Sequence, residues 1–189
     1  MYNHQIFNNV QKHIVLSDFD KQQFLSSLIS RDVQKKQLLL EQGQICKKIY
    51  FVESGSLRAF NVNGDGKEST IMFAVQDWWI TDMNCFVHRK PAMLSIEALE
   101  NSKIMELDFD LLEELYQNIP KFERFFRILF QNAYIREQLR ALHNISLTTE
   151  EKYWQFVENY PAIVQKVTQK QIASYLGVTP EFLSSVKKK

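Results

Sequence analysis

The spacing of apolar residues changes character along this chain. Over residues 3–30 apolar positions recur at helical intervals, with a break near Ser17 and Asp18, where a hydroxyl and an acid can cap a helix. Two short helices are therefore expected there. Over residues 37–108 the hydrophobic pattern changes to short runs typical of β-strands, at 38–41, 49–52, 57–62, 69–75, 94–99 and 103–107. Their spacing predicts an antiparallel sandwich or roll, with a hairpin turn at residues 63–66, where Asn-Gly and Asp-Gly tolerate positive φ.

The longest periodic segment follows a short capped helix expected over residues 108–117. It opens at Pro120 and reaches to about residue 144, with one set of positions spaced alternately by three and four: Phe125, Ile128, Asn132, Ile135, Leu139 and Leu142. This is the a/d seam of a coiled coil, so the segment predicts a helix through which two copies of the chain dimerise, with Asn132 fixing the register. A second stripe of Phe122, Phe126, Leu129 and Ala133 indicates that the same helix also packs on its own β domain. A helix that does only the latter is the alternative.

The C-terminal two dozen residues contain two further apolar runs at helical spacing, separated by Gly177. The apolar positions are Ile172, Leu176, Val178, Leu183 and Val186. Gly177 can end the first helix with a positive φ, and Thr179 with Pro180 can start the second as N-cap and first helical residue. Ala173 sits where the two helices must approach closely. The pattern predicts a helix-turn-helix, and an ordinary antiparallel helix pair is the alternative.

Composition supports a folded chain and localises its positive charge. Hydrophobic residues make up 45% and aromatic residues 13% of the 189 residues, which argues against disorder, and the net charge is only +1. From residue 164 onward the charged residues are five lysines against Glu181 alone. A basic C-terminal tip is what contact with phosphates requires, although terminal lysines also occur as a solvated tail.

The distribution of Cys and His argues against several other classes. Cys46 and Cys85 form no Cys-x-x-Cys pair, so we expect buried thiols in a reducing compartment, and without an apolar run long enough to span a bilayer we expect a cytoplasmic protein with no membrane partner. The histidines form no multi-ligand spacing, and the carboxylate pairs lie in helical segments. We therefore expect neither a metal site nor an enzyme.

The order of these elements resembles the catabolite activator and fumarate–nitrate regulator (Crp/Fnr) family of bacterial transcription factors over nearly the whole chain. Residues 52–58 resemble its strand–Gly–strand turn, residues 64–68 its hairpin before the ligand pocket, and residues 73–86 and 119–126 resemble short members from Bacteroidetes. The resemblance implies an α+β fold: an antiparallel β-roll, or jelly roll, of the cyclic-nucleotide-binding type with flanking helices. The implied domains are a sensor (1–119), a dimerisation helix (120–145) and a helix-turn-helix DNA-binding domain (146–189).

The resemblance also locates a ligand pocket and shows a departure in it. Cyclic-nucleotide-binding members hold the ribose with Gly-Glu and the cyclic phosphate with an Arg followed by Ser or Thr; here the corresponding pairs are Thr81-Asp82 and Ala92-Met93. A phosphate needs a cation and free backbone donors. Ala92 supplies no cation; Arg89 and Lys90 in the adjacent loop before Pro91 are the nearby substitutes, and solvation of both is the alternative. We therefore expect that cyclic AMP does not bind here in the usual mode.

Two adjacent tryptophans precede these pairs. Trp78 and Trp79 could form an apolar or aromatic wall of the pocket, and packing in the core is the alternative. The expected effector is an unknown small molecule, and no other cofactor is implied.

The predicted recognition helix departs from the family as well. Where members usually offer an Arg after the Ser at position 184, this chain has Ser185, and the printed sequence ends at Lys189, so we expect no full β-wing. The residues predicted to meet DNA are Gln169, Thr179, Glu181, Ser184, Ser185, Lys187 and Lys188. Expected partners are double-stranded DNA with a palindromic operator, a second copy of the chain and RNA polymerase. The alternative function is a dimeric ligand-sensing scaffold that does not bind DNA.

Overall fold

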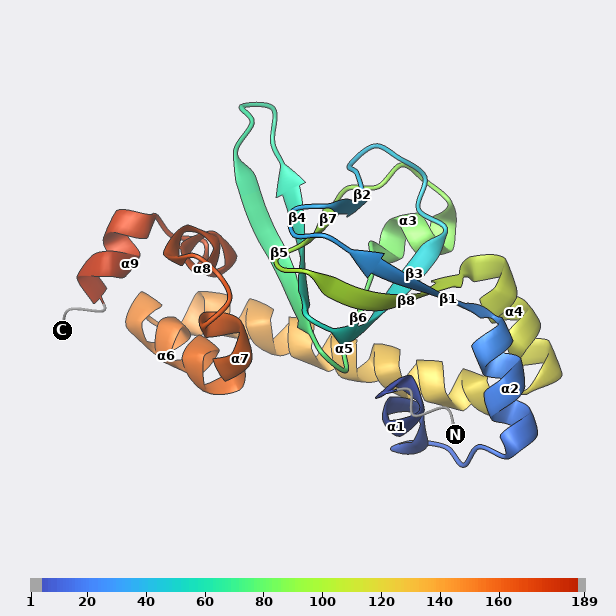
Figure 1. The fold of residues 1–189 in the computed structure, drawn as a ribbon. Coiled ribbons are helices and arrows are strands. Elements are labelled where there is room, and N and C mark those ends of the chain that lie inside the picture. Colours follow the sequence, from blue (N-terminus) through green and yellow to red (C-terminus); the bar gives the residue numbers. More distant parts are fainter. Residues whose placement is uncertain (1–4, 187–189) are drawn as a thin grey trace.

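The computed structural model describes residues 5–186 and shows an α+β fold with antiparallel sheets (Figure 1). The strands are β1 (Leu28–Val33), β2 (Leu38–Leu40), β3 (Lys48–Ser54), β4 (Ser56–Val62), β5 (Glu68–Val75), β6 (Trp79–Ile80), β7 (Ser95–Ala98) and β8 (Ser102–Asp108). The helices are α1 (Gln5–Gln11), α2 (Asp18–Ser26), α3 (Met83–His88), α4 (Phe109–Asn118), α5 (Lys121–Ser146), α6 (Thr149–Asn159), α7 (Pro161–Val164), α8 (Gln169–Leu176) and α9 (Pro180–Val186).

The strands form two four-stranded sheets within the described residues. Their orders are β1-β8-β3-β6 and β2-β7-β4-β5, and all pairings are antiparallel. The β4–β5 hairpin turns at residues 63–66 as predicted, where the Asn63 side chain accepts hydrogen bonds from Asp65 N and Lys67 N. Gly55 joins β3 to β4 with a φ of 94°, and a Cβ there would lie 2.2 Å from Ser102 Oγ, so only glycine fits this turn.

The N-terminal helical prediction was wrong after residue 26. The helix α2 begins with a capping box, in which Ser17 and Asp20 satisfy each other's backbone donors, and ends at Ser26. Leu28 and Ile29 instead lie in β1, paired with β8 from Leu28↔Leu107 to Val33↔Ser102. The apolar residues in this stretch fit either period, and pairing with a strand more than seventy residues away decides between them.

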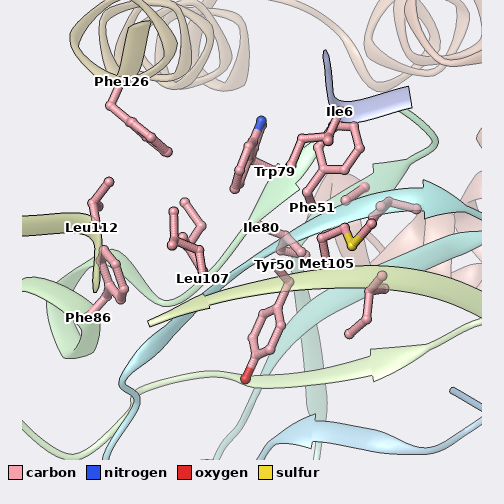
Figure 2. Packing of buried hydrophobic residues seen from close by; sticks show 14 of the residues in the cluster. Ile6, Tyr50, Phe51, Trp79, Ile80, Phe86, Met105, Leu107, Leu112 and Phe126 are labelled. Atoms are coloured by element: carbon pink, nitrogen blue, oxygen red, sulfur yellow. The ribbon is translucent and has the colours of Figure 1, made fainter. Parts of the chain in front are cut away.

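The main core lies between the two sheets and the first half of α5. Phe122 and Phe126 are buried, as the second stripe predicted, and Phe122 packs 4.7 Å from Phe24 between ring centroids. Figure 2 shows Trp79 from β6 and Phe126 from α5 pointing into the same cluster; their rings are 5.4 Å apart. The prediction that Phe125 lies in the dimer seam was wrong, because this residue is 1% exposed inside its own chain and cannot face a second copy.

Helices α6 to α9 form a second cluster at the far end of α5 (Figure 1). Its buried centre contains Ile172, Ala173, Leu176 and Leu183 of the predicted helix pair, together with Tyr153 and Phe156 of α6. Each of α6 and α8 starts with a capping box, Thr148 with Glu151 and Thr168 with Gln171. Among the described helices, none is long and apolar enough to cross a membrane.

Candidate functional site

A cavity of about 600 Å³ lies between the roll and the middle of α5. Its wall comes from β3 and β5, from the segment that runs from Asp77 through β6 into α3, from the loop at residues 93–94, and from α5. Five of the seven pocket residues chosen from the sequence line it: Trp78, Trp79, Thr81, Asp82 and Met93. The other two, Arg89 and Ala92, are not among its lining residues.

Asp82 is the central polar residue of this wall. Its carboxylate is 1% exposed and caps α3 by accepting a hydrogen bond from Cys85 N at 3.1 Å. The other carboxylate oxygen accepts from two successive backbone donors, Met93 N at 2.7 Å and Leu94 N at 3.0 Å. Asp82 therefore ties α3 to the loop that follows it and uses three backbone donors.

The residue considered as a substitute cation points elsewhere. Arg89 ends α3 in a left-handed conformation with a φ of 55°, pairs with Asp110 and stacks 4.6 Å from the ring of Phe109. Ala92 is buried, and its backbone pairs with Gly43 and Gln44. The expectation that Arg89 and Ala92 line the pocket was therefore wrong, because local capping and pairing direct both toward other parts of the fold.

Trp79 packs in the core and also borders the cavity, whereas Trp78 lies in the cavity wall. Trp79 is 7% exposed in the core, where its indole nitrogen donates to Asn9 Oδ1 at 3.0 Å, and it also borders the cavity. Trp78 is half-buried and lies under the guanidinium of Arg136, 5.0 Å from ring centroid to Cζ. Arg136 is a cavity residue that the sequence did not single out; its spacing on the helix gave no signal of its contact with Trp78.

The prediction that the two cysteines are buried is confirmed. Cys46 and Cys85 are free and buried beside the cavity wall. Cys46 N donates to Cys85 Sγ at 2.7 Å, and burial raises the pKa of the Cys85 thiol. Within residues 5–186 no group of three or more His, Cys, Asp or Glu side chains could hold a metal ion.

The helix-turn-helix has the geometry that the sequence predicted. Gly177 ends α8 with a φ of 72°, and its backbone nitrogen bonds to the Ala173 and Ser174 carbonyls. Thr179 starts α9 by accepting from Phe182 N at 3.2 Å. Ala173 is fully buried, which fits the close approach of the two helices.

The predicted DNA-facing residues lie on the outer side of this unit. Gln169, Thr179, Glu181 and Ser185 are exposed and Ser184 is partly exposed. The Ser185 hydroxyl donates to the Phe182 carbonyl at 2.7 Å. Phe182, which the sequence argument did not select, is 52% exposed on the same helix, and its exposure is its only signal. Lys187 and Lys188 lie outside the described residues.

The predicted seam of α5 is open beyond Phe125. Ile135, Leu139 and Leu142 are 53%, 49% and 57% exposed, and Asn132 lies exposed in line with them. Ile128 is partly buried. The stripe therefore continues from the roll toward the helix-turn-helix without a partner in the described part of the chain.

The helix-turn-helix also contacts the roll directly. Ser174 of α8 accepts from Thr70 N of β5 at 2.9 Å, and Figure 1 shows α8 beside that strand. Lys166 Nζ lies 2.6 Å from a carboxylate oxygen of Glu100. Burial opposes the effect, but hydrogen bonds from Lys166 and Ser56 hold the pKa of Glu100 below its ordinary value. These contacts link the two ends of the molecule.

Comparison with known proteins agrees with this architecture. Residues 30–119 match the model of the cyclic nucleotide-binding domain. The regulatory protein HlyX of Actinobacillus pleuropneumoniae is 27% identical over 173 residues, covering 85% of this chain and 71% of HlyX. The chain spans 63% to 71% of the length of the curated relatives it matches.

Solved structures share the fold at lower identity. The c-di-GMP-responsive global regulator CLP of Xanthomonas campestris superposes with a TM-score of 0.74 at 14% identity, covering 91% of this chain and 90% of that one. A Crp/Fnr-family transcriptional regulator from Eubacterium rectale gives a TM-score of 0.72 at 16% identity, covering 92% and 82%. The fold is thus a cyclic-nucleotide-binding β-roll joined by a long helix to a helix-turn-helix. The relatives found by sequence are transcriptional regulators of the Crp/Fnr type, and this chain is similar to them over most of its length.

Proposed function

We propose that this protein is a homodimeric, sequence-specific DNA-binding transcription regulator whose β-roll senses a small molecule. The observation that carries the proposal is the helix-turn-helix, with left-handed Gly177 between two helices and with Thr179, Glu181 and Ser185 exposed. The proposal keeps the domains expected from the sequence, namely a sensor over 1–119, a dimerisation helix over 120–145 and a DNA-binding domain over 146–189.

The exposed side of α9 offers chemistry suited to base edges. Glu181 can accept from the cytosine amine, and Ser184 and Ser185 can act as donor or acceptor to either base type. Phe182 adds an apolar surface that fits a thymine methyl group. Gln169 and Lys170 at the start of α8 are exposed and suit phosphate contacts, with Lys187 and Lys188 proposed for the same role.

The dimer sets the form of the target site. Two copies joined along α5 would place two α9 helices on one face of the duplex, reading half-sites about 34 Å apart. A palindromic operator follows from the two-fold symmetry. Contact with RNA polymerase is part of the proposal for a regulator of this family and would occur in the cytoplasm.

The sensor does not fit cyclic AMP in the family's usual mode. Among the described lining residues, none supplies a cation at the place of the family's arginine, since Arg89 pairs with Asp110, and Asp82 already uses the Met93 and Leu94 backbone donors. A cyclic phosphate that used these donors would have to displace a buried carboxylate from two hydrogen bonds. We propose that the effector is a different small molecule held between the roll and α5.

Selection from a random duplex library tests DNA binding. We expect enrichment of a palindrome with half-sites one helical turn apart, and binding that weakens steeply with salt. Lys170→Ala should reduce the salt slope by about one unit with unchanged sequence preference, whereas Phe182→Ala should alter the preferred bases with an unchanged slope. Glu158→Gln, on the exposed side of α6, is the control.

The competing function predicts a different result. A ligand-sensing scaffold would enrich no palindrome, and neither substitution would change retention of DNA. That outcome would contradict the proposed regulator function and favour the ligand-sensing scaffold.

A further inference from the structure

The cavity wall contains an anion that belongs to the protein. Three backbone donors converge on the Asp82 carboxylate at 2.7 to 3.1 Å, and the side chain is 1% exposed. Two successive N–H groups pointing at one oxygen are an arrangement that binds anions. Here the carboxylate already fills it, so these donors are not free for an anionic group of a ligand.

The other charged residues around the cavity do not favour an added anion. Within the described residues, its charged lining consists of Asp77, Asp82 and Glu137 against Arg136, three carboxylates and one guanidinium. Arg136 is already placed over Trp78 and lies 3.9 Å from Glu137, with a third of its side chain exposed. Solvent screens Arg136, whereas the negative charge of Asp82 is buried, so the repulsion outweighs the attraction.

A cation does not fit better, because the carboxylates have partners. Asp82 accepts three hydrogen bonds, Asp77 pairs with Lys12, and Glu137 lies 3.3 Å from Arg140. Asp77 Oδ1 is buried and has no hydrogen-bond partner among the described residues, so it suits a neutral donor such as a hydroxyl.

The rest of the wall is largely apolar, and Thr81, Asn84, Asn132 and Tyr134 add neutral polar groups to it. Side chains of Ile49, Ile71, Ile80, Met83, Leu94 and Phe130 surround the cavity. Its volume of about 600 Å³ lies in the range of small-molecule sites. The binding free energy of a ligand that fills the cavity comes mainly from the transfer of its apolar surface out of water.

We propose that the cavity takes an uncharged, largely apolar molecule with a hydroxyl group, and that Asp82 determines this specificity by occupying the donors an anion would need. This inference rests on the sensor role proposed above and names its ligand class. DNA selection has a separate readout, so a failure of ligand binding leaves the DNA result standing, and the reverse holds too.

Three eight-carbon probes that differ only in their head group test the proposal. N-phenyl-1-naphthylamine, a neutral fluorophore, is bound to the full chain and displaced by 1-octanol, octanoate or octylammonium at pH 7.5. We expect octanol to displace it at concentrations at least tenfold lower than either ion, and cyclic AMP not to displace it. Preference for octanoate would show that Arg136 dominates, preference for octylammonium would show a cation site, and displacement by cyclic AMP would show free phosphate donors. Each of these results overturns the proposal, as does failure of octanol to compete.

Substitution of Asp82 tests its role as the determinant. Asp82→Asn removes the charge at nearly constant size, and we expect octanoate to approach octanol to within about threefold. Unchanged octanol binding would show that the cavity persists in the variant. Asp110→Asn removes one carboxylate outside the cavity and should keep the tenfold preference. A preference in Asp82→Asn as large as in the parent chain would remove Asp82 as the determinant; if the variant fails to fold, the three probes on the parent chain still decide the ligand class.

Discussion

The exposed stripe of α5 makes dimerisation the prediction that the structure allows to be worked out most fully. We consider Ile135→Asp combined with Leu139→Asp. Both side chains lie in the predicted seam, half exposed, and neither belongs to the buried core of the roll. The substitutions should therefore leave the monomer fold intact and act on association alone.

The magnitude follows from the exposed fractions. Ile135 is 53% and Leu139 is 49% exposed, so about half of the full burial free energy of each side chain remains to be gained in a dimer. With roughly 1.5 to 3 kcal/mol for full burial, four half-exposed side chains across the two copies contribute about 3 to 6 kcal/mol. At about 1.4 kcal/mol per tenfold, the dissociation constant should rise by roughly 10² to 10⁴. Facing carboxylates add repulsion and desolvation to this loss.

Sedimentation velocity over a concentration series measures the change. The parent chain should sediment as a dimer and the double variant as a monomer at micromolar concentrations. At concentrations low enough for both chains to be monomeric, the parent and the variant should unfold at the same temperature. Ala141→Asp with Asn144→Asp places two carboxylates on exposed positions of the same helix outside the seam and should remain dimeric. If the seam variant has the dissociation constant of the parent, this stripe is not the main interface and the reasoning from its exposure fails.

Three further predictions concern stability and coupling. Phe122→Ala should lower the free energy of unfolding by about 3 to 5 kcal/mol in denaturant titration, because the ring is fully buried; a loss below 1 kcal/mol would contradict its place in the core. Thr168→Ala removes the capping box of α8 and should cost about 1 kcal/mol, whereas Thr168→Ser should restore most of it in the same titration. The pKa of Glu100 is held below its ordinary 4.5, so the stabilisation from its contact with Lys166 is complete above that pH and is lost as the pH falls through the lowered pKa. Glu100→Gln should remove this acid dependence of stability in unfolding curves recorded from pH 6 to 3. An unchanged dependence would exclude the Glu100–Lys166 pair as its source.

Local signals determined much of the fold. The β-type runs, the 63–66 hairpin, the long helix from Pro120 and the helix-turn-helix depend on residue spacing and on caps or turns whose partners lie within a few positions. Thr168 with Gln171 and the left-handed Gly177 are examples, since their hydrogen bonds close inside one helical turn. Such features can be predicted from the sequence because the interacting groups are also neighbours along the chain.

Features that depend on distant partners needed the tertiary structure. Ile29 joined a strand because β8 supplied its pairing, and Phe125 left the seam because the roll covered that part of α5. Asp82 was identified from sequence as a departure, but its three backbone donors and burial emerged only from the folded loop. The sequence by itself therefore determined six of the strands, the long periodic helix and the terminal helix-turn-helix, since these follow from local periodicity. The tertiary structure alone decided which side of each helix is covered and which charges face the cavity, because both depend on contacts between residues far apart in the chain.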